Sequence, residues 1–520
     1  MITNTDTAVS LPKNTNQALG IGEFAVNFMN GSIGEPAQEV IDRTELFFTD
    51  AVLCGLSAIA VKTNAPTILR KEAIGFPSEG GATLFGSTQR VFAEKAILAN
   101  CAAVREWDSN GTNFGYNPEL GHTAGEFGHN DFYAVPIAAA QEVGLSGADA
   151  IRGMILLDEI RGRLAEVFGL KTYKIDHVVH GAIASAAVYG AMHGATPEQI
   201  ESAIGMVVAH YIPWRAIRAG KQLSDSKGSS AAISTEVAIV SMKRSMNGFM
   251  GPRDIFRNPE SIFRYFEQTS GDSPFDLNLS HSGSDFAVLG MHFKIGLYEH
   301  QSAGALQGLL NLIQEHSEIA VDPSQIDVIK ITAYEPAFGI IGDPAKRNPK
   351  TRQSADHSMV YIVSTMLRKA EEVASTDGES FFKQSNDEIW KRLMLTPYDF
   401  DYDSINNETT RAIMDTVFFE HGGDDYDKNY PDGIPTSVHI TMKSGSVYDS
   451  GLVMYPSGHA RNETCDLEDI LRAKFKMHGQ IAMDNPEELI DRCTNLSSLS
   501  SEEISEIWNI EIADRPVYQD

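Results

Sequence analysis

Hydrophobic positions in the first half of the chain recur at helical spacing. Apolar residues every three or four positions predict a helix over Asp149–Phe168, with Gly169 as its stop. Gly181–His193 is rich in alanine and uncharged, so we expect a helix buried on all sides. Residues 196–199, Thr-Pro-Glu-Gln, combine an N-cap, a first-turn proline and a capping-box glutamine. With a further Ala- and Ser-rich helix over Ala231–Met246, these patterns predict a largely helical first half.

The pattern changes near residue 285. Alternating apolar and polar positions predict strands, the last two joined by a turn at 443–446, over Ile326–Ile331, Val438–Met442 and Val447–Tyr455. Helices are expected between them, over Ala355–Arg368 and Asp387–Met394. A mixed α/β segment is therefore inserted into a largely helical protein.

Helical character returns over Asp466–Trp508, where the acidic run Glu502–Glu506 is expected to be a solvated helix face. We predict a mainly α fold with an α+β part. Residues 1–284 and 462–520 form the all-helical domain, and residues 285–461 form a smaller α/β domain.

The composition excludes several classes of protein. The 520 residues carry a formal net charge of −28, which argues against nucleic acid as a partner because phosphate binding needs a cationic face. No run of about 18 apolar residues predicts a membrane span. The polar N-terminal stretch, residues 1–17, lacks the features of a secretory signal or transit peptide. We expect a short loose tail there, on a cytoplasmic protein.

The cysteines at positions 54, 101, 465 and 493 are far apart in sequence. They are too sparse for a disulfide scaffold and lack the clustering that holds an iron–sulfur cluster or structural zinc. We expect most of them to be small buried apolar residues.

Polar clusters in the first half carry the candidate chemistry. Asp108 and Thr112 can face the same way at a helix end, and the Gly- and Asn-rich loop that follows could bring His129 beside them. The alternative is a polar loop with Asx turns. His177 and His180 can share a helix face and admit a metal site, although a single His acting as acid or base is better supported. Asp176 could be a helix cap.

A third cluster is cationic. Arg215, Arg218, Lys221 and Lys227 are surrounded by glycine and serine in an otherwise acidic chain. Arginine offers bidentate contacts to carboxylates and lysine offers a point charge, so these residues suit a small polyanion. A solvated basic loop is the alternative.

Two further clusters lie in the second half. Lys294 is followed six residues later by His300, and the last cluster combines residues 350–361 with residues 455–461. Each is a polar turn with a histidine when taken alone. Phosphate-loop, nucleophile-elbow and dinucleotide fingerprints are missing from the sequence.

Taken in order, these clusters resemble the motifs of the MmgE/PrpD family, which includes 2-methylcitrate dehydratases. The resemblance runs from about residue 45 to about residue 480. In the first half, Asp108–Thr112 resembles the family's Asp-x-x-Asp-Thr, Gly128-His129 resembles Gly-His-Pro, and Asp176–Val178 resembles Leu-Asp-His-Val. Arg215, Arg218 and Lys227 keep the spacing of Arg-x-x-Arg with a later Lys, and Phe293–Ile295 with His300 resembles Phe-Lys-Ile with a later His. Ala355–His357 with Tyr361 resembles Ala-Asp-His with a later Tyr, and Tyr455–Arg461 resembles Tyr-Pro-x-Gly-His-Ala-Arg.

The departures from these motifs surround the expected pocket. Gly111 stands where the family has its second acid, and Asn130 stands where it has proline. The loop between Thr112 and His129 is longer than in relatives and carries an extra histidine, and the Lys294–His300 spacing is shorter. The substrate can therefore differ from the namesake's.

The resemblance implies a large all-helical domain, a smaller α/β lid domain and a site between them, usually in a homodimer without metal or organic cofactor. It implies di- and tricarboxylate substrates. The implied catalytic residues are Asp108, His129, His177, Lys227, Lys294 and His300. The implied substrate-binding residues are Thr112, Arg215, Arg218 and Tyr361. Dehydration removes a proton next to a carboxylate and expels hydroxide, so cations must neutralise developing charge and an acid must protonate the leaving group. Which histidine serves as acid, and whether Asp108 accepts the proton, does not follow from sequence.

Three functions follow as hypotheses. The first is a hydro-lyase that dehydrates 2-methylcitrate or a similar citrate-like acid to a cis-aconitate-type product. The second is a decarboxylase or epimerase for aconitate-like or other dicarboxylate substrates on the same scaffold. The third is an inactive relative that senses a polycarboxylate or holds partners.

Overall fold

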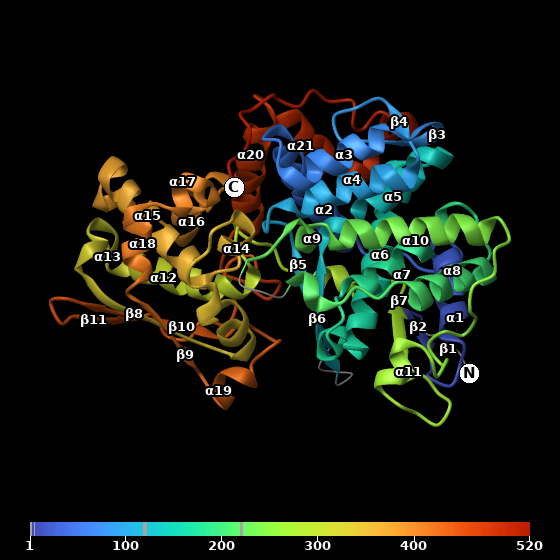
Figure 1. The fold of residues 1–520 in the computed structure, drawn as a ribbon, viewed down its shortest axis with the longest axis horizontal. Coiled ribbons are helices and arrows are strands. Elements are labelled where there is room, and N and C mark those ends of the chain that lie inside the picture. The colour runs from blue at the N-terminus through green and yellow to red at the C-terminus, as the bar shows by residue number, and fades with distance from the viewer. Residues whose placement is uncertain (1–2, 5, 118–121, 219–221) are drawn as a thin grey trace.

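The computed structural model describes residues 3–4, 6–117, 122–218 and 222–520. Helices account for 57% of the chain and strands for a small part, which confirms the mainly α class. Figure 1 shows two lobes side by side, one built of helices and one built of helices and a sheet. The division into two domains at residues 284/285 and 461/462 stays a prediction.

The helical lobe is formed by the first eleven helices and the last three. Their bounds are α1 Gln17–Met29, α2 Gln38–Ala60, α3 Asn64–Ile74, α4 Ala93–Glu106, α5 Ala134–Val143, α6 Gly147–Val167, α7 Val178–Met192, α8 Pro197–His210, α9 Asp225–Gly228, α10 Ser230–Met246, α11 Ile262–Phe266, α20 Leu467–Ala482, α21 Glu487–Cys493 and α22 Ser501–Ser505. Helix α7 is buried almost throughout and packs against α6, α8 and α10. It is the central helix of this lobe.

Local chemistry explains why several helices begin where the sequence predicts. In α8, Thr196 and Gln199 form a reciprocal capping box with Pro197 at the first helical position. Ser146 and Asp149 form the same box at the start of α6. The predictions for α6, α7, α8 and α10 are confirmed within a few residues.

Two predicted irregular segments are strands instead. The expected loose N-terminal tail contains β1 Thr3–Asn4 and β2 Ala8–Leu11, and β2 pairs antiparallel with β7 Leu277–Ser280. Leu11 is 1% exposed, so burial of its side chain fixes this segment. The expected polar loop after Thr112 is a hairpin of β5 Thr112–Asn117 and β6 His122–His129. A further small pair is β3 Pro77–Thr83 with β4 Arg90–Val91.

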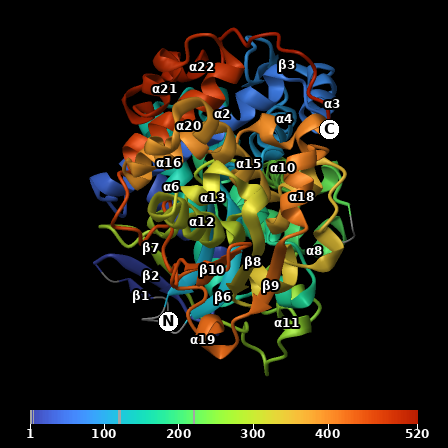
Figure 2. The ribbon, with the colours of Figure 1, turned by 90° about the vertical axis from the view of Figure 1, so that its left-hand side faces the viewer.

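The α/β lobe surrounds a four-stranded sheet in the order β11-β10-β8-β9. Strand β8 pairs antiparallel with β10 and parallel with β9. The strands are β8 Ile326–Ala333, β9 Val417–His421, β10 Thr436–Met442 and β11 Val447–Asp449, and the helices are α12 Ala303–Glu315, α13 Glu318–Val321, α14 Arg352–Ala355, α15 Met359–Asp377, α16 Asn386–Leu393, α17 Tyr402–Ile405, α18 Glu408–Met414 and α19 Asp424–Asp427. Helices α12, α15 and α16 lie over one face of the sheet in both views (Figures 1 and 2).

Three predicted elements have different bounds. Strand β11 ends at Asp449 rather than Tyr455 because Gly451 adopts a positive φ of 66° and turns the chain. The predicted helix 355–368 is broken into α14 and α15, and α15 begins at Met359 with Ser358 as its N-cap. The C-terminal stretch 466–508 is helical, as predicted, and is divided into α20, α21 and α22. The break before α15 is important for the candidate site.

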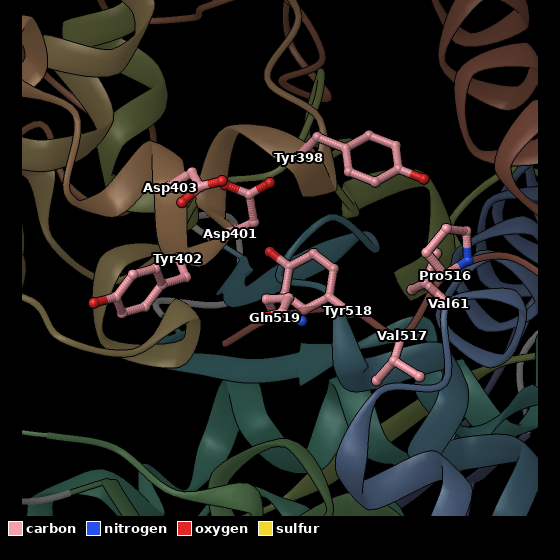
Figure 3. A pocket seen from close by; sticks show the side chains of 9 residues that line it. All are labelled: Val61, Tyr398, Asp401, Tyr402, Asp403, Pro516, Val517, Tyr518 and Gln519. Carbon is pink, nitrogen blue, oxygen red and sulfur yellow. The ribbon is translucent and has the colours of Figure 1, made fainter.

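Residues 513–520, here called the strap, pass between the two lobes. On the helical lobe the N–H of Tyr518 donates to the carbonyl of Val61 at 2.8 Å. On the α/β lobe the Tyr518 hydroxyl donates to the carbonyl of Pro397 at 2.7 Å. A cavity of about 190 Å³ lies beside the strap (Figure 3) and is lined by Val61, Tyr398, Asp401, Tyr402, Asp403, Pro516, Val517, Tyr518 and Gln519.

The sequence predicts neither a membrane-spanning helix nor a disulfide framework. Among the described residues no single helix is both long and apolar enough to cross a membrane. The pair α2 and α3, bent by 89°, has the length and composition of a membrane span when the two helices are taken together. All four cysteines are free thiols, and three of them are buried, as the sequence predicts.

Candidate active site

The carboxylate of Asp108 lies at the centre of a buried group of charges. Helix α4 ends at Glu106, and Trp107 leads the chain out in an extended conformation. Arg105, in the last turn of α4, brings Nη1 to 3.2 Å from Oδ1 of Asp108. The N–H of Tyr298 donates to the Asp108 carbonyl at 3.0 Å and fixes the backbone. The end of α4 therefore presents an acid together with its counter-charge.

Two lysines from distant segments complete the surroundings of Asp108. The Lys294 ammonium contacts Oδ1 of Asp108, and Lys227 of α9 places Nζ 3.4 Å from Oδ2. Burial raises the pKa of the Asp108 carboxyl, but the charges of Arg105, Lys294 and Lys227 outweigh burial and hold the pKa well below its usual value. Asp108 is therefore an anion near neutral pH.

The break between α14 and α15 contributes a histidine and a second carboxylate. His357 lies between the two acids, with Nε2 3.2 Å from Oδ2 of Asp108 and Nδ1 2.6 Å from Oδ1 of Asp356. Arg352, which is fully buried, places Nη1 3.2 Å from Asp356 and Nη2 2.5 Å from Glu106. A salt-bridge chain thus joins the end of α4 to the start of α15.

Lys227 has the most useful acid–base properties in this group. Burial lowers the pKa of Lys227 to about 8, although Asp356 and Asp108 oppose the shift. Burial and the Lys227 charge lower the pKa of His357 to about 4. Near neutral pH, Lys227 can therefore exchange its proton, while His357 is a neutral imidazole that can accept or donate a hydrogen bond.

A second group lies at the start of α7. The Arg218 guanidinium contacts Oδ2 of Asp176 through Nε and lies 3.2 Å from Oδ1 through Nη2. His177 places Nδ1 3.7 Å from the same carboxylate. Asp176 also accepts from the N–H of Val178 at 3.4 Å, but the N-cap of α7 is His177, so Asp176 serves the ion pair and is not the helix cap. His180 does not join this group, because its Nε2 lies 3.0 Å from the carbonyl of Phe168.

His300 belongs to a stack of three buried imidazoles. The ring of His292 lies 5.1 Å from that of His300, with planes 3° apart, and 4.0 Å from that of His459. Burial, together with His459 and Lys294, lowers the pKa of His300 well below its usual value. His300 is therefore a neutral imidazole near pH 7 rather than a ready proton donor.

The other residues that the sequence predicts for the site are Thr112, Tyr361, Arg215 and His129. Thr112 is buried and exchanges backbone hydrogen bonds with His292 at 2.9 and 2.7 Å. Tyr361 is fully buried, and its hydroxyl donates to the carbonyl of Asp399 at 2.7 Å. Arg215 is half-buried in the turn Arg215–Arg218. The side chain of His129 lies outside the described part, and its backbone pairs with Thr112. The roles assigned to these residues stay predictions.

The structure explains why glycine occupies position 111. A Cβ there would collide with the ring of Phe47, which stacks on Phe293 with centroids 3.9 Å apart. A carboxylate is supplied nearby by Asp50, whose Oδ2 accepts from the Gly111 N–H at 3.0 Å and whose Oδ1 lies 2.5 Å from Lys474. Asp50 of α2 therefore places a carboxylate beside the backbone of position 111.

The oxygens of Asp108 and Asp356 and a nitrogen of His357 lie within 4.8 Å of one another, which is close enough to share a metal ion. The same acids face Arg105, Lys227, Lys294 and Arg352. A divalent cation would have to enter against these four charges, so the donor set fits a metal poorly. The expectation of metal-free chemistry stays a prediction.

Sequence reasoning did not assign Arg105, Arg352, Asp356 or His357 to the site. The sequence marks residues 350–358 as a polar cluster but does not show which way their side chains point. Arg105 carried an available signal, because an Arg-Glu pair ends the otherwise Ala-rich helix just before Asp108. A charge in the last turn of a buried helix needs a partner.

Two domains of one known protein family match most of the chain. The MmgE/PrpD N-terminal domain matches residues 22–276, and the MmgE/PrpD C-terminal domain matches residues 298–396. The chain therefore belongs to the MmgE/PrpD family, as the ordered motifs predicted.

Its curated relatives are distant but cover most of the chain. It is 24% identical over 448 residues to the mitochondrial 2-methylcitrate dehydratase of Yarrowia lipolytica, covering 84% of this chain and 80% of that protein. It is 22% identical over 473 residues to the 2-methylcitrate dehydratase of Escherichia coli O157:H7, covering 90% of each. An alkylcitrate dehydratase from a fungal species is 22% identical over 333 residues, covering 63% of this chain and 60% of that protein. One relative is named mitochondrial, so the cytoplasmic location stays a prediction.

Proposed function

We propose that this protein is a cofactor-independent hydro-lyase that dehydrates 2-methylcitrate or a similar citrate-like tricarboxylate to a cis-aconitate-type product. Family membership and the names of its relatives support a dehydratase. The single observation that carries the proposal is the buried contact of Lys227 and Lys294 with Asp108, in which Lys227 has a pKa of about 8. We also propose that it acts as a homodimer on a small polycarboxylate.

The reaction requires an acceptor for a weakly acidic proton. Lys227, as the neutral amine, takes the proton from the carbon next to a substrate carboxylate, and the C–H electrons form the double bond. Lys294 and Arg105 stabilise the negative charge that develops on that carboxylate. Asp108 orients both cations instead of accepting the proton, because its pKa is held well below the ordinary value by Arg105, Lys294 and Lys227 against the effect of burial.

The departing hydroxide requires a proton from an acid. We assign this proton to His177, because its imidazole lies at the start of α7 with Nδ1 3.7 Å from the Asp176 carboxylate. His300, neutral in its stack, is better suited to hydrogen bonding with the substrate. The C–O bond breaks as His177 transfers its proton, so water leaves and the charges balance.

The decisive assay uses chelator-treated pure protein with 2-methylcitrate, citrate and cis-aconitate in separate reactions. Ultraviolet absorbance of the conjugated acid and release of carbon dioxide are followed together. Rising absorbance with 2-methylcitrate and no carbon dioxide supports the hydro-lyase. Carbon dioxide from cis-aconitate would establish the decarboxylase instead, and a change in the optical rotation of 2-methylcitrate, the chiral member of the three, without either signal would establish an epimerase.

Replacing Lys227 tests its role as the base. Lys227→Met is expected to reduce kcat by about 10²–10⁴-fold, the usual contribution of a general base. Lys227→Arg keeps the positive charge but cannot release its proton, so it should be equally inactive. For the wild type, kcat/KM should pass through a maximum as pH rises, because the reaction needs Lys227, whose pKa is about 8, as the neutral amine and His177 with its proton.

Lys350→Met is the matched control, because Lys350 is an exposed lysine whose described contact is made by its backbone. Circular dichroism and thermal unfolding should show that all three variants fold. Substantial activity in Lys227→Arg would exclude Lys227 as the base.

A further inference from the structure

The bend that carries Asp108 is anchored by helix α20, from the C-terminal part of the chain. Residues 107–110 form this bend directly after α4. Lys474 of α20 is fully buried, and its Nζ lies 2.5 Å from the carbonyl oxygen of Ser109 and 2.5 Å from Oδ1 of Asp50. Lys474 lies beyond the last of the sequence motifs. The bend therefore depends on a lysine that no motif marks.

A second contact of α20 with the bend is made one helical turn further on. His478 is four residues after the lysine, so the two side chains share a face of α20. Nε2 of His478 lies 2.9 Å from Oγ of Ser109, and Nδ1 lies 3.1 Å from Oγ of Ser57 in α2. The indole N–H of Trp107 donates to the same Ser57 hydroxyl at 2.9 Å. Helices α2 and α20 therefore hold both neighbours of Asp108.

Asp50 extends this attachment to the far end of the bend. Its Oδ2 accepts from the N–H of Gly111 at 3.0 Å, while its Oδ1 contacts Lys474. A hydrogen bond from an ammonium to a carbonyl is stronger than a neutral one, and a buried carboxylate that loses its counter-charge is costly. Loss of the Lys474 ammonium would release the bend at Ser109 and weaken its attachment at Gly111.

The opposite side of the bend reaches the candidate site. The Asp108 carboxylate contacts Lys294 and lies 3.4 Å from Nζ of Lys227. Because the Ser109 carbonyl and the Asp108 side chain belong to adjacent residues, a rotation of the bend that frees the carbonyl also turns the carboxylate. A displacement of about 1 Å within an active site can lower a rate about 10²-fold. The anchoring of the bend therefore bears on the chemistry.

We propose that Lys474 is a positioning residue, which fixes the bend and thereby directs the Asp108 carboxylate toward the two lysines of the site. It acts through Ser109 and Asp50 rather than on the substrate. The inference deepens the proposed function and rests on it, since these two lysines are the proposed base and a proposed stabiliser of the developing charge.

The pKa values of Lys227 and Lys294 report the position of Asp108 without any turnover. In both lysines burial is the largest influence and lowers the pKa, and the charge of Asp108 is among those that raise it. Retreat of Asp108 therefore lowers both pKa values, whereas a general loosening that admits water raises them. Trace acetylation with isotope-labelled acetic anhydride at a series of pH values, read by peptide mass spectrometry, measures the titration midpoint of each lysine.

Lys474→Met removes the ammonium and keeps most of the side-chain volume. The labelling midpoint of Lys227, about 8 in the wild type, should fall by about one unit, and that of Lys294 should fall with it. In the dehydration assay, kcat should fall about 10–10²-fold with KM nearly unchanged, because the reacting groups are displaced while the substrate still binds.

A double variant keeps the test valid if Lys474→Met does not fold. Asp50→Asn/Lys474→Met removes both charges, and the asparagine oxygen can still accept from the N–H of Gly111. It should unfold at a higher temperature than Lys474→Met, but its two midpoints should stay low because the contact with the Ser109 carbonyl is still missing. Lys476→Met is the matched control on the same helix, where Lys476 has a side chain that is 42% exposed, and it should change neither midpoint.

Unchanged midpoints in the folded double variant would overturn the positioning role. Raised midpoints would overturn it as well, because they would show that Lys474 only keeps water out of the site. If no citrate-like acid is turned over, the labelling still decides the role of Lys474. If dehydration is observed while the midpoints do not move, the proposed function stands without this role.

Discussion

Asp108 keeps its charge although burial opposes ionisation. A carboxyl with 1% exposure and no partner would be neutral near pH 7, but Asp108 faces Arg105, Lys227, Lys294 and His357. Removing any one cation would leave the Asp108 carboxylate under-compensated. At the scale of single residues, the site is a balance of three positive charges around one buried carboxylate.

Position 111 provides the sharpest test at this scale. Gly111→Asp restores the second acid of the family motif, but its Cβ would meet Phe47 Cδ1 at 2.7 Å. Overpacking of this kind typically costs about 1–3 kcal/mol, and urea denaturation measures the loss. In Gly111→Asp/Phe47→Ala the aspartate has room, so the double variant should be more stable than the sum of the single effects predicts. Strict additivity would show that Phe47 does not exclude the acid.

At the scale of elements, the interruption between α14 and α15 builds the site. A continuous helix over 355–368 would have placed Asp356 and His357 on helical faces. Instead α14 ends at Ala355, and Ser358 caps α15 by accepting from the N–H of Tyr361 at 3.4 Å. The two residues in the break then reach Lys227 and Asp108.

Ser358→Ala tests this break. Loss of an N-cap typically lowers the free energy of unfolding by about 1 kcal/mol, and here it should also lower kcat because His357 loses its fixed position. Thr196→Ala removes the cap of α8, in a helix that contributes no residue to the site, and serves as the matched control. Urea denaturation should show similar losses in both variants, while kcat falls only in Ser358→Ala. Equal kcat in the two variants would contradict a positioning role for the cap.

The same elements show what the sequence could predict. Thr196 and Gln199 start a helix through contacts within four residues, so the sequence alone predicts α8. The hairpin after Thr112 pairs β5 with β6, and Thr112 also bridges to His292, about 180 residues away, but the polar residues there look like a loop in the sequence. The motifs place Asp108, Lys227 and Lys294 in one site, but the role of Arg352 becomes visible only once both lobes are assembled, because it joins Glu106 to Asp356.

At the scale of the whole molecule, the strap couples the lobes to the site. The ring of Tyr518 packs on Trp107 with centroids 5.1 Å apart, and its hydroxyl reaches the α/β lobe at Pro397. Two residues further on, Asp520 places a carboxylate oxygen 3.6 Å from Nε of Arg352, the arginine that holds Glu106 and Asp356. The strap therefore stabilises the arrangement of charges across the lobes.

Tyr518→Ala should therefore lower both stability and activity. Removing a largely buried aromatic ring costs about 3–5 kcal/mol, whereas Tyr518→Phe loses only the hydroxyl contact, worth about 1 kcal/mol. Unfolding in urea measures the loss of stability. The value of kcat, taken at a urea concentration where every variant is folded, measures the loss of activity separately. Asp514→Asn is the control, because Asp514 pairs with Lys62 at the exposed surface of the same segment. If Tyr518→Ala kept full activity while folded, the strap would stabilise the lobes without helping to position Arg352 and Asp356.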